Sequence, residues 1–511
     1  MTQPPAPPRA EEPEELLRRI ALDPARPRFH LTAPMGWLND PNGVCQWDGV
    51  HHLFYQYNPA GGFHRRIHWG HATSLDLVHW TDQPVALAPE PGPDADGCWS
   101  GVLVNDGGAP TLVYSGNFGD HATLPCLATG SPDLLTWTKS PANPVIDTLP
   151  LPGMSGFRDH CVWREGGHWR MLVGAGVTRA GGFLALYESD DLRSWRYLGP
   201  LLGGTASDRA LDDPFWLGTM WECAELFRLD GDLDVPLDGP PSGRDFLVFS
   251  AWHEGVTMHA LYWSGSYRGD RFVPDSLQRI DLGGRCFYAP QSYRDDSGRR
   301  IMFGWLQDAR SIDRSVAAGW AGVMSLPRLV TDRGDGTLHF SPVPEVDALR
   351  AEPLVDRTES IGAGGVRLAE VSGDQFDLEL DVALEPGAGI DVQLPGADLG
   401  DGCIGGVVLR VVRIDRDRLS VQLDRSATTS EPGVDVGPRG GLAPVGADGT
   451  TDVRIIVDHS ALEIFVNGVA LSARVHPEAT TTALGLRTVG AEATVGVRAW
   501  RMADAWPADR R

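Results

Sequence analysis

The most informative acidic residue of this chain is Asp40, which occupies the segment WLNDPNG at residues 37–43. The proline after Asp40 and the Asn-Gly pair restrict the backbone, so the carboxylate is held in one direction. The same composition is also typical of an ordinary hairpin turn. Residues that follow at regular spacing favour a functional role over a plain turn.

Polar or aromatic residues recur at nearly equal intervals after Asp40. Ser100, Asp159, Glu222 and Tyr288 follow in steps of 60, 59, 63 and 66 residues. Four strands and their turns fill such an interval, which is the size of one propeller blade. If the innermost strand of each blade presents one of these residues at the axis, five blades share a single pocket.

A second repeat runs beside the first. The segments SLDLVHW (74–80), SPDLLTW (131–137) and SDDLRSW (189–195) start 57 and 58 residues apart. Together the two repeats predict an all-β protein with a five-bladed β-propeller. A wet central channel lined by polar groups, as in propellers without catalytic activity, is the alternative interpretation.

Three carboxylates on separate blades permit glycoside cleavage, which needs one ionised carboxylate and one protonated carboxyl group. Glu222 lies between a tryptophan and a cysteine, and apolar surroundings favour the protonated form, so we expect it to be the acid. Asp40 has Asn39 and backbone amides as donors, which suits a nucleophile. We expect Asp159 to stay ionised beside Arg158 and to bind sugar hydroxyls. For each carboxylate, a structural role is the alternative.

The chain of 511 residues is too long for one compact core. We predict a flexible leader with a short helix at residues 1–27 and a five-bladed β-propeller catalytic domain at 28–341. A connector at 342–352 and a β-sandwich domain at 353–511 follow, because the last part contains alternating strands and no helical pattern.

The formal net charge is −24, which disfavours nucleic acid or an anionic membrane as a partner. A neutral small-molecule carbohydrate fits this charge, while the oligomeric state is left open. Seven scattered cysteines predict free thiols, and the absence of a signal peptide or a long apolar run predicts a soluble, cytoplasmic protein.

Several histidines are dense in the sequence but lack the spacing of metal ligands, so we expect no metal and no cofactor. These histidines are His51, His52, His68, His71 and His79.

The chain resembles glycoside hydrolase family 32, the β-fructofuranosidases such as invertase, inulinase and levanase, from Phe29 to Trp500. The motifs that carry the resemblance are WLNDPNG (37–43), FYQYNP (54–59), WGHA (69–72), WSG (99–101), FRD (157–159), WEC (221–223), FYAPQ (287–291) and GW (319–320).

The resemblance implies a five-bladed propeller followed by a β-sandwich, and a retaining exo-acting hydrolysis of terminal β-D-fructofuranosyl residues of sucrose or short fructo-oligosaccharides. It makes Asp40 the nucleophile, Glu222 the acid/base and Asp159 the stabiliser of the transition state. The implied substrate contacts are Asn39, Gln56, Trp99, Ser100, Arg158, Tyr288 and Trp320.

The sequence departs from the family pattern at five positions. His160 and Ala224 stand where the family usually has proline, and we expect them to relax turns. Cys286 replaces a usual acidic residue, His64 a tryptophan and Ala309 another aromatic residue. We expect the last three to alter the rim of the pocket and thus the choice of leaving group.

Four other functions remain open. A fructosyltransferase uses the same residues, and a furanosidase acting on arabinosides uses a comparable carboxylate trio. A sucrose-6-phosphate hydrolase gains support if His64, Arg65 and Arg66 bind a phosphate, although a solvated loop is the competing interpretation. A sugar-binding propeller without turnover is the fourth, and the three carboxylates argue against it.

Overall fold

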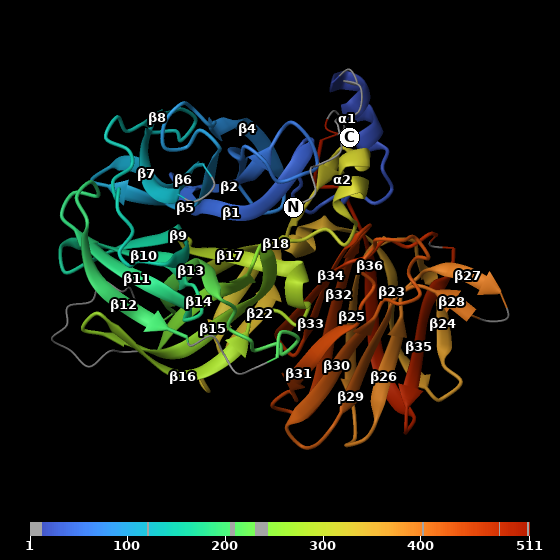
Figure 1. Ribbon diagram of the computed structural model, residues 1–511. Helices are drawn as coiled ribbons and strands as arrows, with labels where there is room; N and C mark the ends of the chain where they lie inside the picture. Colours follow the sequence, from blue (N-terminus) through green and yellow to red (C-terminus); the bar gives the residue numbers. More distant parts are fainter. Residues whose placement is uncertain are drawn as a thin grey trace.

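The structure is a computed structural model that describes residues 13–119, 122–204, 210–229, 244–400, 403–479, 481–507 and 510. These residues form two parts, a ring of β-sheets and a β-sandwich beside it (Figure 1). The expected all-β architecture of a propeller followed by a sandwich is therefore confirmed. Residues 1–12, which include the predicted leader, lie outside the described residues.

Five sheets of the described residues make up the ring. The first contains β1 (Gly36–Trp47), β2 (Val50–Asn58), β3 (His68–Ser74), β4 (Trp80–Leu87) and the short β19 (Trp320–Ala321). The second contains β5 (Gly97–Asp106), β6 (Ala109–Phe118), β7 (Ala122–Gly130) and β8 (Trp137–Lys139). The third contains β9 (Met154–Glu165), β10 (His168–Val177), β11 (Gly181–Ser189) and β12 (Arg196–Gly203). The fourth contains β13 (Met220–Arg228), β14 (Asp245–His253), β15 (Val256–Arg268) and β16 (Arg271–Arg279), and the fifth contains β17 (Phe287–Arg294), β18 (Arg300–Leu306), β20 (Val323–Met324), β21 (Arg328–Asp332) and β22 (Leu338–Pro342).

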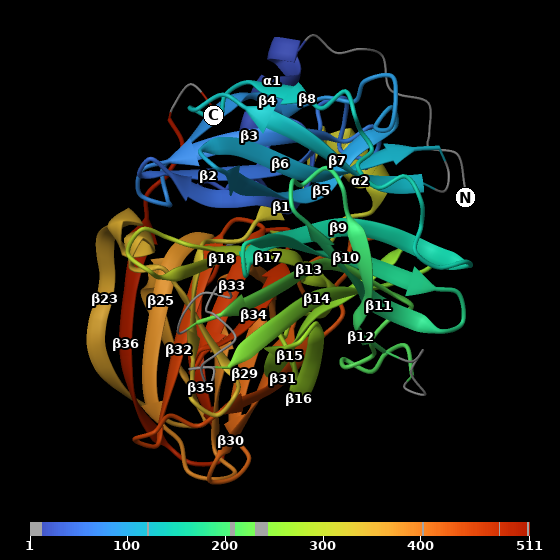
Figure 2. The ribbon, with the colours of Figure 1, turned by 90° about the vertical axis from the view of Figure 1, so that its left-hand side faces the viewer.

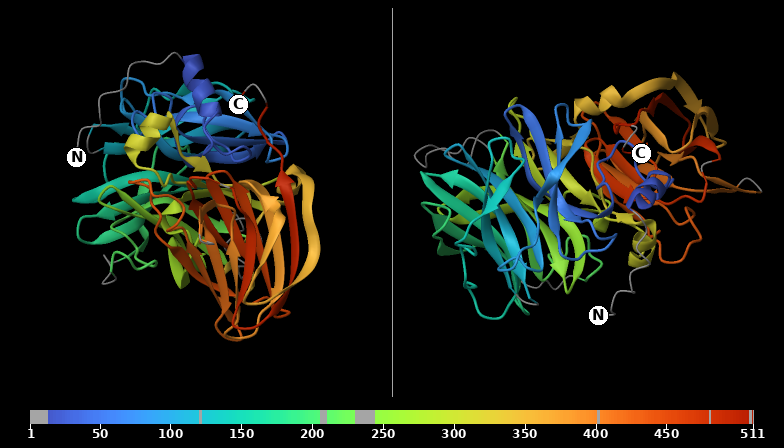
Figure 3. Two further views of the ribbon diagram at one scale, coloured as in Figure 1. Left: turned by 90° about the vertical axis from the view of Figure 1, so that its right-hand side faces the viewer. Right: turned by 90° about the horizontal axis from the view of Figure 1, so that it is seen from above.

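The first strands of these sheets meet at the centre of the ring. β1 contacts β5, β5 contacts β9, β9 contacts β13, β13 contacts β17, and β17 returns to β1. The ring is also closed by hydrogen bonds, because β19 pairs in parallel with the start of β1. The view from above shows the sheets of the ring on one side and the sandwich on the other (Figure 3).

The repeated Ser-Asp-Leu-Trp segments form the same turn three times, each between the third and fourth strands of a sheet. In each turn a buried leucine has a left-handed backbone, and its carbonyl accepts a hydrogen bond from the tryptophan indole. The contacts are Trp80 to Leu77 at 3.0 Å, Trp137 to Leu134 at 3.1 Å and Trp195 to Leu192 at 2.8 Å. The sequence repeat therefore reports a repeated structural unit, as predicted.

The sandwich consists of two six-stranded sheets and a small hairpin. One sheet contains β23 (Arg350–Ile361), β36 (Ala493–Met502), β25 (Gln375–Ala383), β32 (Thr450–Asp458), β33 (Ala461–Val466) and β34 (Val469–Arg474). The other contains β24 (Val366–Ser372), β35 (Ala483–Val489), β26 (Gly389–Gln393), β29 (Val408–Arg413), β30 (Arg418–Asp424) and β31 (Arg439–Pro444), and the hairpin pairs β27 (Ala397–Gly400) with β28 (Cys403–Gly405). Alternate residues of β25 fill the core between the sheets, as the period of two predicts.

Short helices join or flank these parts. α1 (Pro13–Ala21) is the short helix predicted within residues 1–27, and its Ile20 is buried in the main core. α2 (Ile312–Ala318) and the 3₁₀ turn η1 (Gly284–Cys286) belong to the fifth sheet region. The connector forms the 3₁₀ helix η2 (Pro344–Leu349), and the first sandwich strand begins at Arg350, three residues before the expected boundary.

The sandwich packs against the fifth sheet of the ring, where β34 contacts β18 and β22 (Figure 2). At this contact the fully buried Arg328 of the ring donates to Glu463 of the sandwich at 2.6 Å and to Asp281 at 2.9 Å. A buried charge without these partners is strongly unfavourable, so the network fixes how the two parts meet.

No helix among the described residues is long and apolar enough to span a bilayer. The six cysteines whose side chains are described carry free thiols, as the scattered spacing predicts.

His30 links the N-terminal segment to the sandwich and is fully buried. Its Nδ1 lies 2.8 Å from Asp458 Oδ2, and its Nε2 lies 3.2 Å from Glu463 Oε1. Burial opposes the charged imidazolium, but the two carboxylates outweigh it and raise the pKa of His30 to about 8.

Because this pKa lies above the ordinary value of 6.5, the stability that His30 contributes is complete below pH 6.5 and is lost as the pH rises through about 8. We expect the free energy of unfolding of the unmodified protein to fall between pH 6.5 and pH 9. This fall is expected to be about 2 kcal/mol larger than the fall in a His30→Gln variant. Thermal unfolding at both pH values measures this. His51→Gln is the matched control, because burial lowers the pKa of His51, the opposite direction to the shift of His30. Equal pH dependence of His30→Gln and the unmodified protein contradicts the assignment.

Candidate active site

The five first strands all depart from regular pairing at the level of the predicted ladder. The register shifts fall between Leu38 and Pro41 in β1, Trp99 and Gly101 in β5, Arg158 and His160 in β9, Glu222 and Glu225 in β13, and Tyr288 and Gln291 in β17. A β-bulge adds an unpaired residue and turns the neighbouring side chains out of the regular alternation. The bulges therefore bring the ladder residues to one place at the axis.

Three of these bulges contain a non-glycine residue with a left-handed backbone: Asp159 (φ 63°), Cys223 (φ 47°) and Ala289 (φ 51°). This conformation is uncommon for residues with a Cβ and costs on the order of 1 kcal/mol or more at each position. The surrounding contacts must hold this strain, which lies at Asp159 itself and at the residues directly after Glu222 and Tyr288.

Asp40 is held by three donors. Asn39 Nδ2 donates to its Oδ1 at 2.9 Å, Ser100 Oγ donates to its Oδ2 at 2.6 Å, and the Cys223 thiol lies 3.5 Å from the same Oδ2. Burial raises the pKa of Asp40, while the Ser100 and Asn39 bonds oppose this shift because they stabilise the anion. Asn39 is confirmed as a donor, whereas the Ser100 hydroxyl of β5 and the Cys223 thiol of β13 stand in place of the predicted backbone amides.

Glu222 meets charged and polar partners instead of the apolar surroundings that its sequence neighbours suggest. The guanidinium of Arg158 donates to Glu222 Oε1, with its Nε at 2.8 Å, and the Tyr288 hydroxyl lies 2.6 Å from Oε2. The expectation of an apolar environment is therefore wrong. Side chains alternate along a strand, so adjacent residues in the sequence do not surround a strand carboxylate.

Arg158 is consequently not the partner that keeps Asp159 ionised. Asp159 Oδ2 accepts a hydrogen bond from the Cys223 backbone at 3.4 Å and lies 3.5 Å from the Cys223 thiol. Burial and the charge of Glu222 raise the pKa of Asp159 to about 8, and the positive charge of Arg158 only partly opposes them. The prediction that Arg158 keeps Asp159 ionised is therefore corrected. Arg158 binds Glu222, and a single guanidinium does not offset the burial of several carboxylates.

Aromatic rings surround the guanidinium. Arg158 lies over the ring of Trp99 at 5.6 Å and over that of Trp252 at 5.1 Å. The exposed His64 meets Trp99 edge to face at 5.6 Å and Trp37 at 6.1 Å. Desolvation by the surrounding residues, together with the nearby Arg158 charge, lowers the pKa of His64 to about 4. The imidazole is therefore neutral at pH 7.

The other expected contacts lie in different environments. Gln56 is buried, and its amide donates to the Cys98 carbonyl at 3.2 Å. Trp320 is also buried, and its indole N–H donates to Asp23 at 2.7 Å. Trp320 therefore has no open face for a sugar, and its prediction as a substrate contact is wrong. The GW motif instead supplies β19, which closes the ring.

Two of the departures from the family pattern are buried away from any rim. Cys286 is buried in the main core, and nearby charges come from Asp281 and the sandwich residue Arg425. Ala309 is buried, and its carbonyl accepts from the Asp435 amide of the sandwich at 2.7 Å. The expectation that both alter the pocket rim is corrected, while the exposed His64 lies beside the aromatic residues.

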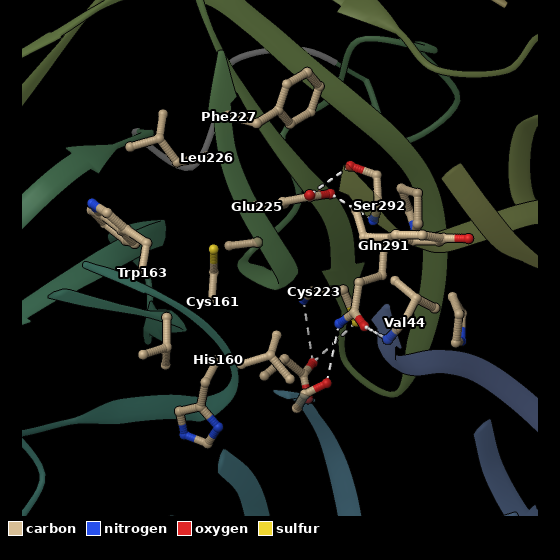
Figure 4. Close-up of a pocket in the computed structure, with 18 of the residues that line it drawn as sticks. Val44, His160, Cys161, Trp163, Cys223, Glu225, Leu226, Phe227, Gln291 and Ser292 are labelled. Atoms are coloured by element: carbon tan, nitrogen blue, oxygen red, sulfur yellow. Dashed lines mark hydrogen bonds between the residues drawn. The ribbon is translucent and has the colours of Figure 1, made fainter. Parts of the chain in front are cut away.

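An axial cavity of about 410 Å³ continues from the carboxylates along the same five strands (Figure 4). Of the three carboxylates only Asp159 lines it, so it lies beyond the bulges rather than around Glu222. Within it Glu225 bonds to the Ser292 hydroxyl at 2.6 Å, and Gln291 accepts from the Val44 amide at 3.1 Å. These side chains connect neighbouring strands of the ring.

Sequence inspection missed Trp252, Ser115 and Gln291 as parts of this site. Trp252 and Ser115 come from second strands, where the ladder of first-strand positions gives no signal. Gln291 belongs to the FYAPQ motif, but its amide spans three strands by contacting Val44 and Gly101. Their place beside the site follows from the register in which the strands pair, and this register cannot be seen in the sequence.

Comparison with known proteins shows similarity to one protein family over both the ring and the sandwich. The family model described as "Glycosyl hydrolases family 32 N-terminal domain" matches residues 30–342, and "Glycosyl hydrolases family 32 C terminal" matches residues 345–501. The chain is 36% identical over 400 residues to a "Sucrose-6-phosphate hydrolase" of Bacillus subtilis (strain 168), covering 75% of this chain and 79% of that protein. It is 33% identical over 483 residues to a "Raffinose invertase" of Escherichia coli, covering 90% and 91%.

The fold is also similar to solved structures. Fructan 1-exohydrolase IIa from Cichorium intybus superposes with a TM-score of 0.82 at 25% identity, covering 95% of this chain and 98% of that one. The similarity extends over both the ring and the sandwich.

The raised pKa of Asp159 predicts a stability cost. Its carboxyl keeps a proton in the folded protein that the unfolded chain releases, so stability falls as the pH rises from the ordinary 3.8 to about 8. We expect Asp159→Asn, which cannot ionise, to raise the free energy of unfolding by on the order of 5 kcal/mol at pH 8 and to leave it nearly unchanged at pH 4. Chemical denaturation followed by tryptophan fluorescence measures both values.

Asp245→Asn is the control for this experiment. Asp245 is a buried propeller aspartate that accepts from Arg228 at 2.9 Å, so its substitution breaks an ion pair and destabilises the protein. If Asp159→Asn also destabilises at pH 8, the assigned proton on Asp159 is wrong.

Proposed function

This chain belongs to glycosyl hydrolase family 32, and from that premise we propose that it is a retaining, exo-acting β-fructofuranosidase that hydrolyses sucrose or short fructo-oligosaccharides. The observation that carries the proposal is the convergence of three carboxylates. Cys223 contacts both Asp40 and Asp159, and the adjacent Glu222 is bound by Arg158.

In the proposed first step, a carboxylate oxygen of Asp40 attacks the anomeric carbon of the fructosyl unit. The bond from this carbon to the glycosidic oxygen breaks, and that oxygen takes the proton of Glu222 and leaves as the alcohol. In the second step Glu222 accepts a proton from water while the water oxygen attacks the same carbon, which frees Asp40. Two displacements at one carbon retain its configuration.

Tyr288 and Arg158 position Glu222 for the proposed acid role. The Tyr288 hydroxyl donates to Glu222 Oε2 at 2.6 Å, and it also lies 3.0 Å from the Ala251 carbonyl. Arg158 meanwhile occupies the other oxygen, Oε1.

In this mechanism Asp159 and Arg158 bind the fructose hydroxyls, and Trp99 and Asn39 contact the ring. Ser100 acts through its 2.6 Å bond to Asp40. Fructosyl transfer to a second sugar uses the same first step, and product analysis at high sucrose distinguishes it, because transfer yields oligomers instead of free fructose.

We expect Asp40→Asn to abolish sucrose hydrolysis and Glu222→Gln to lower kcat by roughly 10²–10⁴-fold, the usual size of general acid–base catalysis. NMR of the product formed in methanol is expected to show retained anomeric configuration. Glu225→Gln is the matched control, because Glu225 is as buried as Glu222, at 8% exposure, and lies in the same strand. Inverted product, or full activity in Asp40→Asn, rejects the mechanism.

Hydrolysis of 6-phosphorylated sucrose is the second candidate, favoured by the names of several relatives. His64, Arg65 and Arg66 are exposed, and two guanidinium groups suit a phosphate. A cytoplasmic location, which is also still a prediction, is compatible with such a substrate.

We expect Arg65→Gln with Arg66→Gln to lower kcat/KM for 6-phosphorylated sucrose about 10- to 100-fold, the value of one or two charge-assisted hydrogen bonds, and to change it less than twofold for sucrose. Steady-state rates on both substrates measure this. Arg367→Gln, an exposed arginine of the sandwich, is expected to change neither rate. Equal losses on both substrates remove the phosphate role.

A further inference from the structure

Ser115 is a fully buried serine in β6, the second strand of the second sheet, and no step of the proposed mechanism uses it. Its hydroxyl donates to the Ser100 carbonyl at 3.0 Å and accepts from the Asp159 amide at 2.9 Å. One side chain thus joins residues of two different sheets, each beside a carboxylate of the site.

The register of the strands explains why both contacts exist. Trp99 and Gly101 of β5 pair with consecutive residues of β6, so Ser100 is the extra residue of its bulge. In β9, Asp159 is likewise the extra residue between Arg158 and His160, which pair with consecutive residues of β10. An extra residue has backbone groups without a ladder partner, and buried unpaired groups are costly. Ser115 supplies a partner for each bulge.

The contacts continue from Ser115 to both aspartates. Ser100, whose carbonyl Ser115 binds, donates its own hydroxyl to Asp40 at 2.6 Å. Asp159, whose amide Ser115 binds, holds the strained left-handed backbone at φ 63°. His160 Nδ1 lies 3.4 Å from the same hydroxyl, and with its proton on that nitrogen it completes the pairing of Ser115.

The same arrangement occurs once more across the ring. Ser250 in β14 pairs with Glu222 in its own sheet, and its hydroxyl accepts from the Ala289 amide at 3.1 Å. Ala289 lies in the bulge of β17, directly after Tyr288. A second-strand serine that holds the bulge of the next sheet is therefore a repeated feature of this ring.

We propose that Ser115 is a positioning residue, whose hydroxyl fixes two bulges at once and thereby aims Ser100 at Asp40 and Asp159 into the site. It touches none of the reacting atoms and acts through these neighbours. The proposal rests on the proposed function, because it assigns the purpose of the two bulges to the fructosidase reaction.

The test compares Ser115→Ala with Ser264→Ala in sucrose hydrolysis. Ser264 is an equally buried propeller serine in β15 that bonds to the Ser276 hydroxyl at 2.8 Å, at a register shift between β15 and β16 and away from the bulges of the first strands. We expect Ser115→Ala to lower kcat about 10- to 100-fold with KM changed less than threefold, and Ser264→Ala to keep kcat within twofold. A kcat of Ser115→Ala within twofold of the unmodified protein overturns the proposal.

A double-mutant cycle separates positioning from a general loss of structure. If Ser115 acts through Asp159, Ser115→Ala lowers kcat clearly less in an Asp159→Asn protein than in the unmodified one. Equal losses in both backgrounds overturn the proposal. Ser115→Cys is measured beside Ser115→Ala, because the thiol is nearly isosteric with the hydroxyl but is a weak acceptor. If the alanine variant does not fold, the cysteine variant replaces it in the comparison of kcat losses.

The unmodified protein and Asp40→Asn are assayed in parallel. If the unmodified protein does not release fructose from any fructoside, the proposed function fails. If it does and Asp40→Asn does not, an unchanged Ser115→Ala variant refutes the positioning role alone.

Discussion

The burial of three carboxylates beside one guanidinium is the constraint on which the rest of this structure depends. Arg158 bonds directly to Glu222, and the pKa of Asp159 is raised to about 8, so the cluster keeps a proton at neutral pH. Bringing like charges together out of water is unfavourable, and a flexible scaffold would let them separate. The site therefore requires strands that cannot move apart.

The bulges provide this geometry but create a second problem, because each leaves backbone groups unpaired. Side chains from neighbouring strands pair them: Ser115 and Ser250 from second strands, and Gln291 across the axis from β17 to β1 and β5. The strained residues Asp159 and Ala289 lie directly at these contacts. Strain at the site is thus balanced by hydrogen bonds that also join one sheet to the next.

Among the described residues, the sandwich supports the site through its contacts with the ring. It holds the fifth sheet through the buried Arg328, Glu463 and Asp281, and it holds the start of the chain through His30. Such charges are costly when one partner is lost, so they favour a single relative placement of the two parts. The same contact buries Ala309 and Cys286, which explains why these family departures do not reach the pocket.

The sequence by itself determined the all-β architecture, the repeat and the residues of the ladder, because strand periodicity, turn-forming residues and blade length are local properties. The donation from Asn39 to Asp40 could be predicted from neighbours in the chain, whereas the Ser100 and Cys223 donors come from other strands. Only the tertiary structure decided that Arg158 serves Glu222, that Asp159 keeps a proton, and that Trp320 closes the ring. These outcomes depend on which strands lie side by side and where their register shifts. A carboxylate's charge state is set by groups that approach through space, and these are absent from its sequence neighbourhood.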